Sequence, residues 1–285
     1  MVVSRQIVRK QHRKMKKLLI GLGVAAIVAG GTCRADATES YYGFDEYGGF
    51  WHDAEKTPSN TEDDLMCWAA AGANILAWTG WGRNFENDAD RIFKEYQDYW
   101  TDNGGHTYYG WEWWFNGEND QQGVAGWSQL DQNPSGGAFY EDYQYSDYVH
   151  HSSDDSMAMN IVDEYLHAGY GTTLSIYTEN GGHAISVWGY EYDEFGNYVG
   201  IYITDSDNSK LSDDPVDSLN YVDVLFDDAA DKLFLQDYYN TNDWYIGGIT
   251  ALDRAPVPEP ITMLLFGTGL ATLVVFRGKR KKTLG

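Results

Sequence analysis

A cysteine, a histidine and an aspartate follow one another in an order that could support nucleophilic chemistry. Cys67 stands near the start of an Ala-rich run, His183 begins an apolar segment, and Asp205 ends the next one. A thiolate attacks a carbonyl carbon, an imidazole carries the proton, and a carboxylate orients the imidazole. This chemistry requires the three side chains to meet, which depends on the elements that carry them.

Cys67 falls at the start of a predicted helix. Residues 61–78 are rich in alanine and favour a helix, which Asp63 or Asp64 could cap. Unpaired amides and the helix dipole in the first turn lower the pKa of a thiol. The nearby carboxylates act in the opposite direction, so a histidine cation is needed to hold a thiolate.

His183 begins one strand of a predicted β-hairpin. One register pairs Val187 with Ile203 and His183 with Asp207, and a slip of one turn position pairs His183 with Asp205. In either register a carboxylate lies beside a histidine, which suits a base oriented by a third group. The predicted strands of this region span residues 172–177, 183–192 and 198–205, with a turn at residues 193–197.

Two polar clusters could bind a metal ion, but neither has the required spacing. Residues 205–209 begin like a calcium loop, yet Lys210 stands where the sixth position requires glycine and no glutamate follows at the twelfth. His150 and His151 lie near Asp154 without a zinc-binding motif. We therefore expect no metal and no cofactor.

Both ends of the chain have the composition of targeting signals. Residues 1–17 are basic, residues 18–31 are apolar, and Ala35-Asp36-Ala37 supplies small residues. This order predicts a signal peptide over residues 1–37, cut after about Ala37. The cut removes Cys33 and leaves Cys67 as the remaining thiol, either a buried small hydrophobe or a nucleophile.

Residues 256–285 contain Pro258-Glu259-Pro260, an apolar run over 261–276 and a basic cluster over 277–282. A helix of this run is about 24 Å long, marginal for a hydrocarbon core of about 30 Å. The order resembles the PEP-CTERM sorting signal of exopolysaccharide-producing Gram-negative bacteria. The resemblance implies an exosortase-type processing enzyme as a partner and transient anchoring in the inner membrane before release to the cell surface or beyond. A permanent tail anchor is the alternative.

The body between these signals is strongly acidic. All but two of the 43 acidic residues, but only seven of the 20 basic ones, lie between residues 38 and 256. Such a body has too few cations to neutralise phosphates, so we expect no nucleic-acid partner. Two helices over 156–168 and 228–239 and a strand over 244–252 complete the predicted elements.

Three blocks of the body resemble the IdeS/Mac family of immunoglobulin-G-degrading cysteine endopeptidases. The resemblance implies a papain-like α+β fold over residues 38–255, with the nucleophile on a helix N-terminus packed against an antiparallel sheet. It also implies an exported cysteine endopeptidase that hydrolyses proteins or peptides. The blocks are residues 63–67, 182–189 and 203–207, in the order Cys, His, Asp.

The same resemblance implies the role of each residue. Cys67 is the nucleophile, His183 the base and acid, Asp205 the orienting group, and Asp207 a support. The oxyanion hole uses the Cys67 amide and an upstream lysine. Lys56, the only basic residue between 38 and 82, is the candidate, with Asn60 as a neutral alternative.

Residues 83–170 do not match this family. Their aromatic-rich part, residues 106–148, could select substrates, so specificity for antibodies is not inherited. These aromatic side chains could also stack on sugars or fill a core. A non-enzymatic extracellular matrix protein that binds exopolysaccharide through them is the alternative hypothesis.

Overall fold

An antiparallel sheet that closes on itself organises the protein. The computed structural model describes residues 38–57, 62–117, 136–207 and 217–256. Strands pair in the order β4-β3-β8-β7-β6-β5, and β5 pairs back with β4, so six strands form a closed barrel. β1 pairs with β4 and β2 with β8 outside this ring. The strands are β1 Glu39–Tyr42, β2 Val149–Ser152, β3 Gly171–Thr178, β4 Gly181–Tyr192, β5 Tyr198–Thr204, β6 Asn220–Asp227, β7 Lys232–Leu235 and β8 Tyr245–Leu252.

The prediction of a papain-like α+β fold is wrong, because these strands form a closed six-stranded antiparallel barrel. The sequence-based interpretation lacked the two strands that complete the ring. Residues 228–239 were expected to be a helix, but they contain β7. Leu233 and Leu235 are buried on either side of the more exposed Phe234, which is the alternation of a strand.

The hairpin of β4 and β5 has the first of the two predicted registers next to the candidate site, and its pairing is shifted by one residue between Gly189 and Glu191. Val187 lies opposite Ile203, as predicted, and Ser186 lies opposite Thr204. The predicted strands 172–177, 183–192, 198–205 and 244–252 and the predicted helix 156–168 are confirmed, with ends within two residues of the observed ones. Local alternation and turn residues therefore identified these elements correctly.

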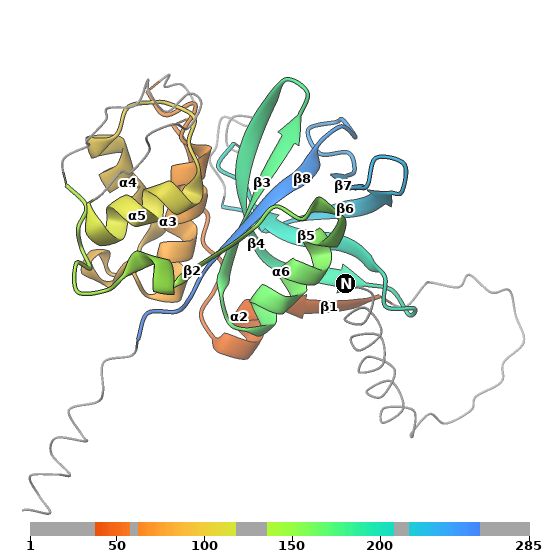
Figure 1. Ribbon diagram of the computed structural model, residues 1–285, viewed down its shortest axis with the longest axis horizontal. Helices are drawn as coiled ribbons and strands as arrows, with labels where there is room; N and C mark the ends of the chain where they lie inside the picture. The colour runs from red at the N-terminus through yellow and green to blue at the C-terminus, as the bar shows by residue number, and fades with distance from the viewer. Residues whose placement is uncertain (1–37, 58–61, 118–135, 208–216, 257–285) are drawn as a thin grey trace, which may run out of the picture. The chain divides into compact units, whose positions relative to one another are not determined.

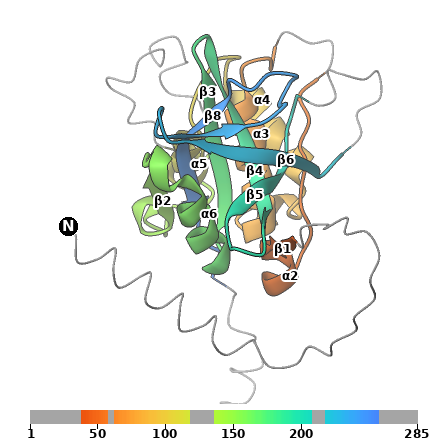
Figure 2. The ribbon, with the colours of Figure 1, turned by 90° about the vertical axis from the view of Figure 1, so that its right-hand side faces the viewer.

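The helices α3, α4 and α5 gather on one side of the barrel, and α6 packs on β3, β4 and β8 (Figures 1 and 2). The helices are α2 Gly43–Tyr47, α3 Cys67–Thr79, α4 Ala89–Tyr99, α5 Thr107–Asn116 and α6 Ala158–His167, with short 3-10 helices η1 Arg83–Phe85, η3 Tyr145–Asp147 and η4 Asp155–Met157.

The helix α3 is the central helix of this side. Every residue from Trp68 to Thr79 is buried, and small alanine side chains let α4, α5 and β4 approach closely. The helix begins at Cys67, later than predicted, and Met66 caps it without a side-chain hydrogen bond. Instead of capping α3, Asp63 accepts hydrogen bonds from the Thr57 amide and the Gln97 side chain.

A buried polar side chain ties α3 to the barrel. Asn74 accepts a hydrogen bond from the Ala54 amide at 2.8 Å. Its amide group donates to the hydroxyls of Ser186 on β4 and Thr204 on β5. Because a buried polar group must be paired, these bonds fix the position of α3 relative to both strands.

Candidate active site

Cys67 stands at the N-terminus of α3 and lines a cleft of about 500 Å³. It is half-buried and is not in a disulfide. Lys56, His183 and Asp207 line the same cleft. The structure therefore brings residues from three distant parts of the chain around one hollow.

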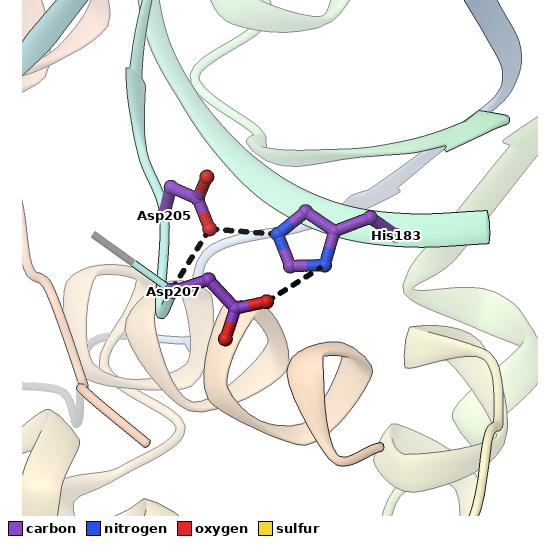
Figure 3. Close-up of side chains that lie close together, drawn as sticks. All are labelled: His183, Asp205 and Asp207. Carbon is purple, nitrogen blue, oxygen red and sulfur yellow. Dashed lines mark hydrogen bonds and ion pairs between the residues drawn. The ribbon is translucent and has the colours of Figure 1, made fainter. Parts of the chain in front are cut away.

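His183 and Asp205 meet at the end of the barrel where β4 begins and β5 ends (Figure 3). His183 alternates in phase with Ile185, and Asp205 with Ile203, and both apolar residues belong to the barrel core. Nε2 of His183 lies 2.7 Å from Oδ1 of Asp205, and both side chains are almost fully buried. The carboxylate thus fixes the plane of the imidazole and leaves Nδ1 for the cleft.

The second oxygen of the Asp205 carboxylate is held by two tyrosines. The hydroxyls of Tyr238 and Tyr239 both donate to Oδ2, the latter at 2.8 Å. The Asp207 amide donates to Oδ1 at 3.0 Å. Asp205 is therefore paired on both oxygens. The sequence did not predict this role of the tyrosines. Residues 228–239 were expected to be a helix, and no motif indicates that these side chains point toward Asp205.

Lys56 lies beside Asp207 with 1% of its surface exposed. Its Nζ is 2.6 Å from Oδ1 of Asp207 and donates to the Asp64 carbonyl at 2.7 Å. Oδ2 of Asp207 is 3.8 Å from Nδ1 of His183 (Figure 3). Asp207 therefore anchors the lysine at the cleft and lies next to the imidazole. Asn60, the neutral alternative for the oxyanion hole, lies outside the described residues.

Charge interactions shift the pKa values of the cysteine and the histidine in opposite directions. Burial raises the pKa of the Cys67 thiol, but the charge and hydrogen bond of His183, the Lys56 charge and the Ala184 amide lower it below its ordinary value. Burial lowers the pKa of His183, but the charges and hydrogen bonds of Cys67 and Asp205 raise it to about 10. Both shifts favour a thiolate beside an imidazolium over the neutral pair.

Asp205 is the fixed negative charge of this arrangement. Burial raises the pKa of its carboxyl, but the charge and hydrogen bond of His183 and the hydrogen bonds of Tyr238 and the Asp207 amide lower it to about 2. Asp205 therefore stays ionised above about pH 2, which includes the whole neutral range.

The same residues offer ligand atoms to a cation, since those of His183, Asp205 and Asp207 lie within 4.8 Å of one another. Their electron pairs are already engaged, however. The Lys56 ammonium pairs with Asp207, and two hydroxyls and an imidazole bind Asp205. A metal ion would have to displace this lysine, so the donor set does not fit one.

The histidines of the other candidate metal cluster have separate partners. His150 lies 2.7 Å from Oδ1 of Asp253 and stacks on Tyr170. His151 contacts the Thr250 hydroxyl. The two rings thus bind neighbouring elements, and nothing in their geometry points to a shared ion.

The aromatic-rich region is largely core in the residues that the structure describes. Trp111, Trp113, Trp114 and Phe115 of α5 are fully buried and pack with Trp68, Trp81 and Tyr96. Buried rings cannot stack on a sugar, so these four side chains do not provide the polysaccharide-binding surface of the alternative hypothesis.

Comparison with known proteins bears on the C-terminus. The family model of the PEP-CTERM protein-sorting motif matches residues 256–281. This motif marks exported proteins that are transiently anchored in the membrane and recognised by an exosortase-type processing enzyme. No curated protein matches the chain, and the comparisons give no support to the IdeS/Mac resemblance.

The two segments that the sequence predicts to enter the membrane lie outside the described residues. The predicted signal peptide, residues 1–37, and the apolar run 261–276 are both in this category. Among the helices that the structure describes, none has the length and apolar character to cross a membrane.

Proposed function

We propose that the protein is an exported cysteine endopeptidase. The observation that carries this proposal is the contact of the Cys67 thiol with an imidazole that Asp205 holds from its other side. A buried structural cysteine needs no such partner. A nucleophile does, because the imidazolium stabilises the thiolate.

The reaction follows from this arrangement. The Cys67 thiolate attacks the peptide carbonyl carbon, and the new C–S bond forms as the carbonyl electrons move to oxygen. Nδ1 of His183 donates its proton to the leaving amine, so the C–N bond breaks and an acyl-thioester remains. The neutral imidazole then takes a proton from water, whose hydroxide attacks the thioester and releases the acid and the thiolate.

Two groups are suited to stabilise the tetrahedral oxyanion. The Cys67 amide lies at the start of α3, where amides have no partner within the helix. The Lys56 ammonium lines the same cleft and is held in place by Asp207. Donors of this kind contribute about 2.7–4 kcal/mol each in serine proteases.

The peptide bond is proposed over other acyl substrates on the strength of the three sequence blocks similar to IdeS/Mac endopeptidases. Asn103, Gly104 and Gly105 form part of the cleft lining, and a side-chain carbon added at Gly104 would meet no heavy atom within 4 Å, so this stretch leaves room for a peptide. No ring or long side chain stands at these three positions.

The test uses the protein without its predicted signal peptide and C-terminal signal, and a peptide library as substrate. Wild type should cleave, and Cys67→Ala and His183→Ala should lose cleavage. Ser152→Ala, outside the cleft, serves as the matched control and should retain it. Cleavage that persists in Cys67→Ala after repurification would falsify the mechanism.

A further inference from the structure

Two neighbouring tyrosines converge on one buried oxygen. Tyr238 and Tyr239 both donate their hydroxyl protons to Oδ2 of Asp205, whose Oδ1 faces Nε2 of His183. Tyr238 is buried in the barrel core, and Tyr239 is half-buried and lines the cleft. The mechanism described above does not use either hydroxyl.

This convergence requires an unusual backbone. Consecutive side chains of an extended strand point in opposite directions, so an ordinary strand could not aim both rings at one atom. Between β7 and β8, Asp237, Tyr239 and Asn240 have φ angles of 53°, 51° and 59°, in the left-handed region that disfavours residues other than glycine. Such strain persists where the surrounding structure fixes it, and it occurs most often at functional sites.

Hydrogen bonds hold the strained turn in place. The Asp237 amide donates to the Asn242 side chain at 2.6 Å, and the Thr241 amide donates to the Tyr238 carbonyl at 3.1 Å. The rings of Tyr238 and Tyr239 pack edge to face, and the Tyr238 ring does the same on Trp244. Hydrogen bonds thus hold the backbone of the turn, and ring contacts hold the side chains of Tyr238 and Tyr239.

Filling the barrel does not explain the two hydroxyls, since phenylalanine would fill the same space. The need of the buried Asp205 carboxylate for hydrogen-bond donors does explain them. A buried carboxylate loses its hydration and needs donors on both oxygens, and the imidazole serves only one of them.

We propose that Tyr238 and Tyr239 are positioning residues that keep the Asp205 carboxylate ionised and directed at His183, and thereby maintain the ion pair of Cys67. This inference rests on the proposed function and adds two residues to its machinery. Burial and the negative charge of Asp205 raise the pKa of both hydroxyls, so they stay protonated and remain donors at neutral pH.

The experiment measures the alkylation of Cys67 by iodoacetamide as a function of pH, in Tyr238→Phe, Tyr239→Phe and the double variant. Alkylation reports the thiolate without any peptide substrate. The acid limb of the profile should move up by about one pH unit in the double variant, because a carboxylate that has lost both donors is no longer held at Nε2 of His183 and stabilises the imidazolium less. Each single variant should show a smaller shift in the same direction.

Tyr190→Phe is the matched control, since its hydroxyl donates at 2.6 Å to Asp163, a carboxylate away from the cleft. Its profile should coincide with that of wild type. A double-variant profile that also coincides with wild type would overturn the positioning role. If the double variant does not fold, the profile of the Tyr239→Phe variant, whose ring is only half-buried, takes its place. A wild-type profile like that of a free thiol would instead overturn the proposed function.

Discussion

His183 connects the cleft to the barrel, because its Nε2 lies 2.7 Å from Oδ1 of Asp205 while its other nitrogen remains for the thiol of Cys67. The imidazole therefore cannot rotate without breaking a charge-assisted hydrogen bond in a buried site. Because His183 contacts both Asp205 and Cys67, its pKa reports on the charges of these two side chains.

The imidazole of His183 should titrate at a lower pH when the thiolate is removed. Burial lowers the pKa of His183, and the Cys67 charge is the largest contribution that raises it to about 10. In Cys67→Ala the pKa should fall by one unit or more, to about 9 or below. Titration of the ring nitrogens by NMR measures it, and equal pKa values in both proteins would contradict the ion pair.

The Asp205 carboxylate should make stability depend on pH in the acid range. Its folded-state pKa of about 2 is below the ordinary 3.8, so its contribution is present above about pH 4 and lost as pH falls through 2. The free energy of unfolding in urea should thus fall more steeply below pH 4 in wild type than in Asp205→Asn. The exposed Asp147→Asn variant is the control and should follow wild type.

Variants of Lys56 and Asp207 should distinguish a catalytic role of the lysine from a structural one. If the ammonium stabilises the oxyanion, Lys56→Met should lower kcat by about 10²–10³-fold. It should also destabilise the fold by about 3 kcal/mol, because it leaves a carboxylate without its counter-charge. In the double variant with Asp207→Asn, stability should recover in part while kcat stays low. Recovery of kcat along with stability would show that the lysine is structural.

Trp114 tests whether the aromatic-rich region binds sugar or fills the core. Its ring is fully buried, and its indole N–H donates to the Trp81 carbonyl at 3.1 Å. Trp114→Ala should lower the free energy of unfolding by about 3–5 kcal/mol. Tyr99→Ala, at a ring that is 40% exposed, should cost far less. Loss of polysaccharide binding in Trp114→Ala, with stability unchanged, would support the alternative hypothesis.

The sequence allowed the histidine–carboxylate contact to be predicted because both residues end strands of one hairpin. Alternation of period two and a polar turn determine the register locally. The pairing of Val187 with Ile203 places His183 at the end of the hairpin where Asp205 and Asp207 follow β5. The contact of Cys67 with this pair was predicted only from the family resemblance, because the spacing of residues so far apart in the sequence does not predict a contact.

Local sequence patterns could not predict that the sheet closes into a barrel. Its closure depends on β7, which has four residues, and on the pairing of β5 with β6 across the segment that separates them. A short run such as Lys232–Leu235 has too few alternations to distinguish a strand from a helix. Composition likewise could not show that the tryptophans of α5 face inward, because buried and sugar-binding aromatic residues are the same residue types.

The bonds of Asn74 make the surroundings of the Cys67 thiol depend on the assembly of the fold. The proposed nucleophile, Cys67, comes from α3 and the proposed base, His183, from the barrel, and Asn74 joins α3 to β4 and β5. In an unfolded chain Cys67 has neither the imidazolium nor the lysine beside it and is an ordinary thiol. Under the proposed function, an exported chain therefore stays inactive until α3 has packed on the barrel.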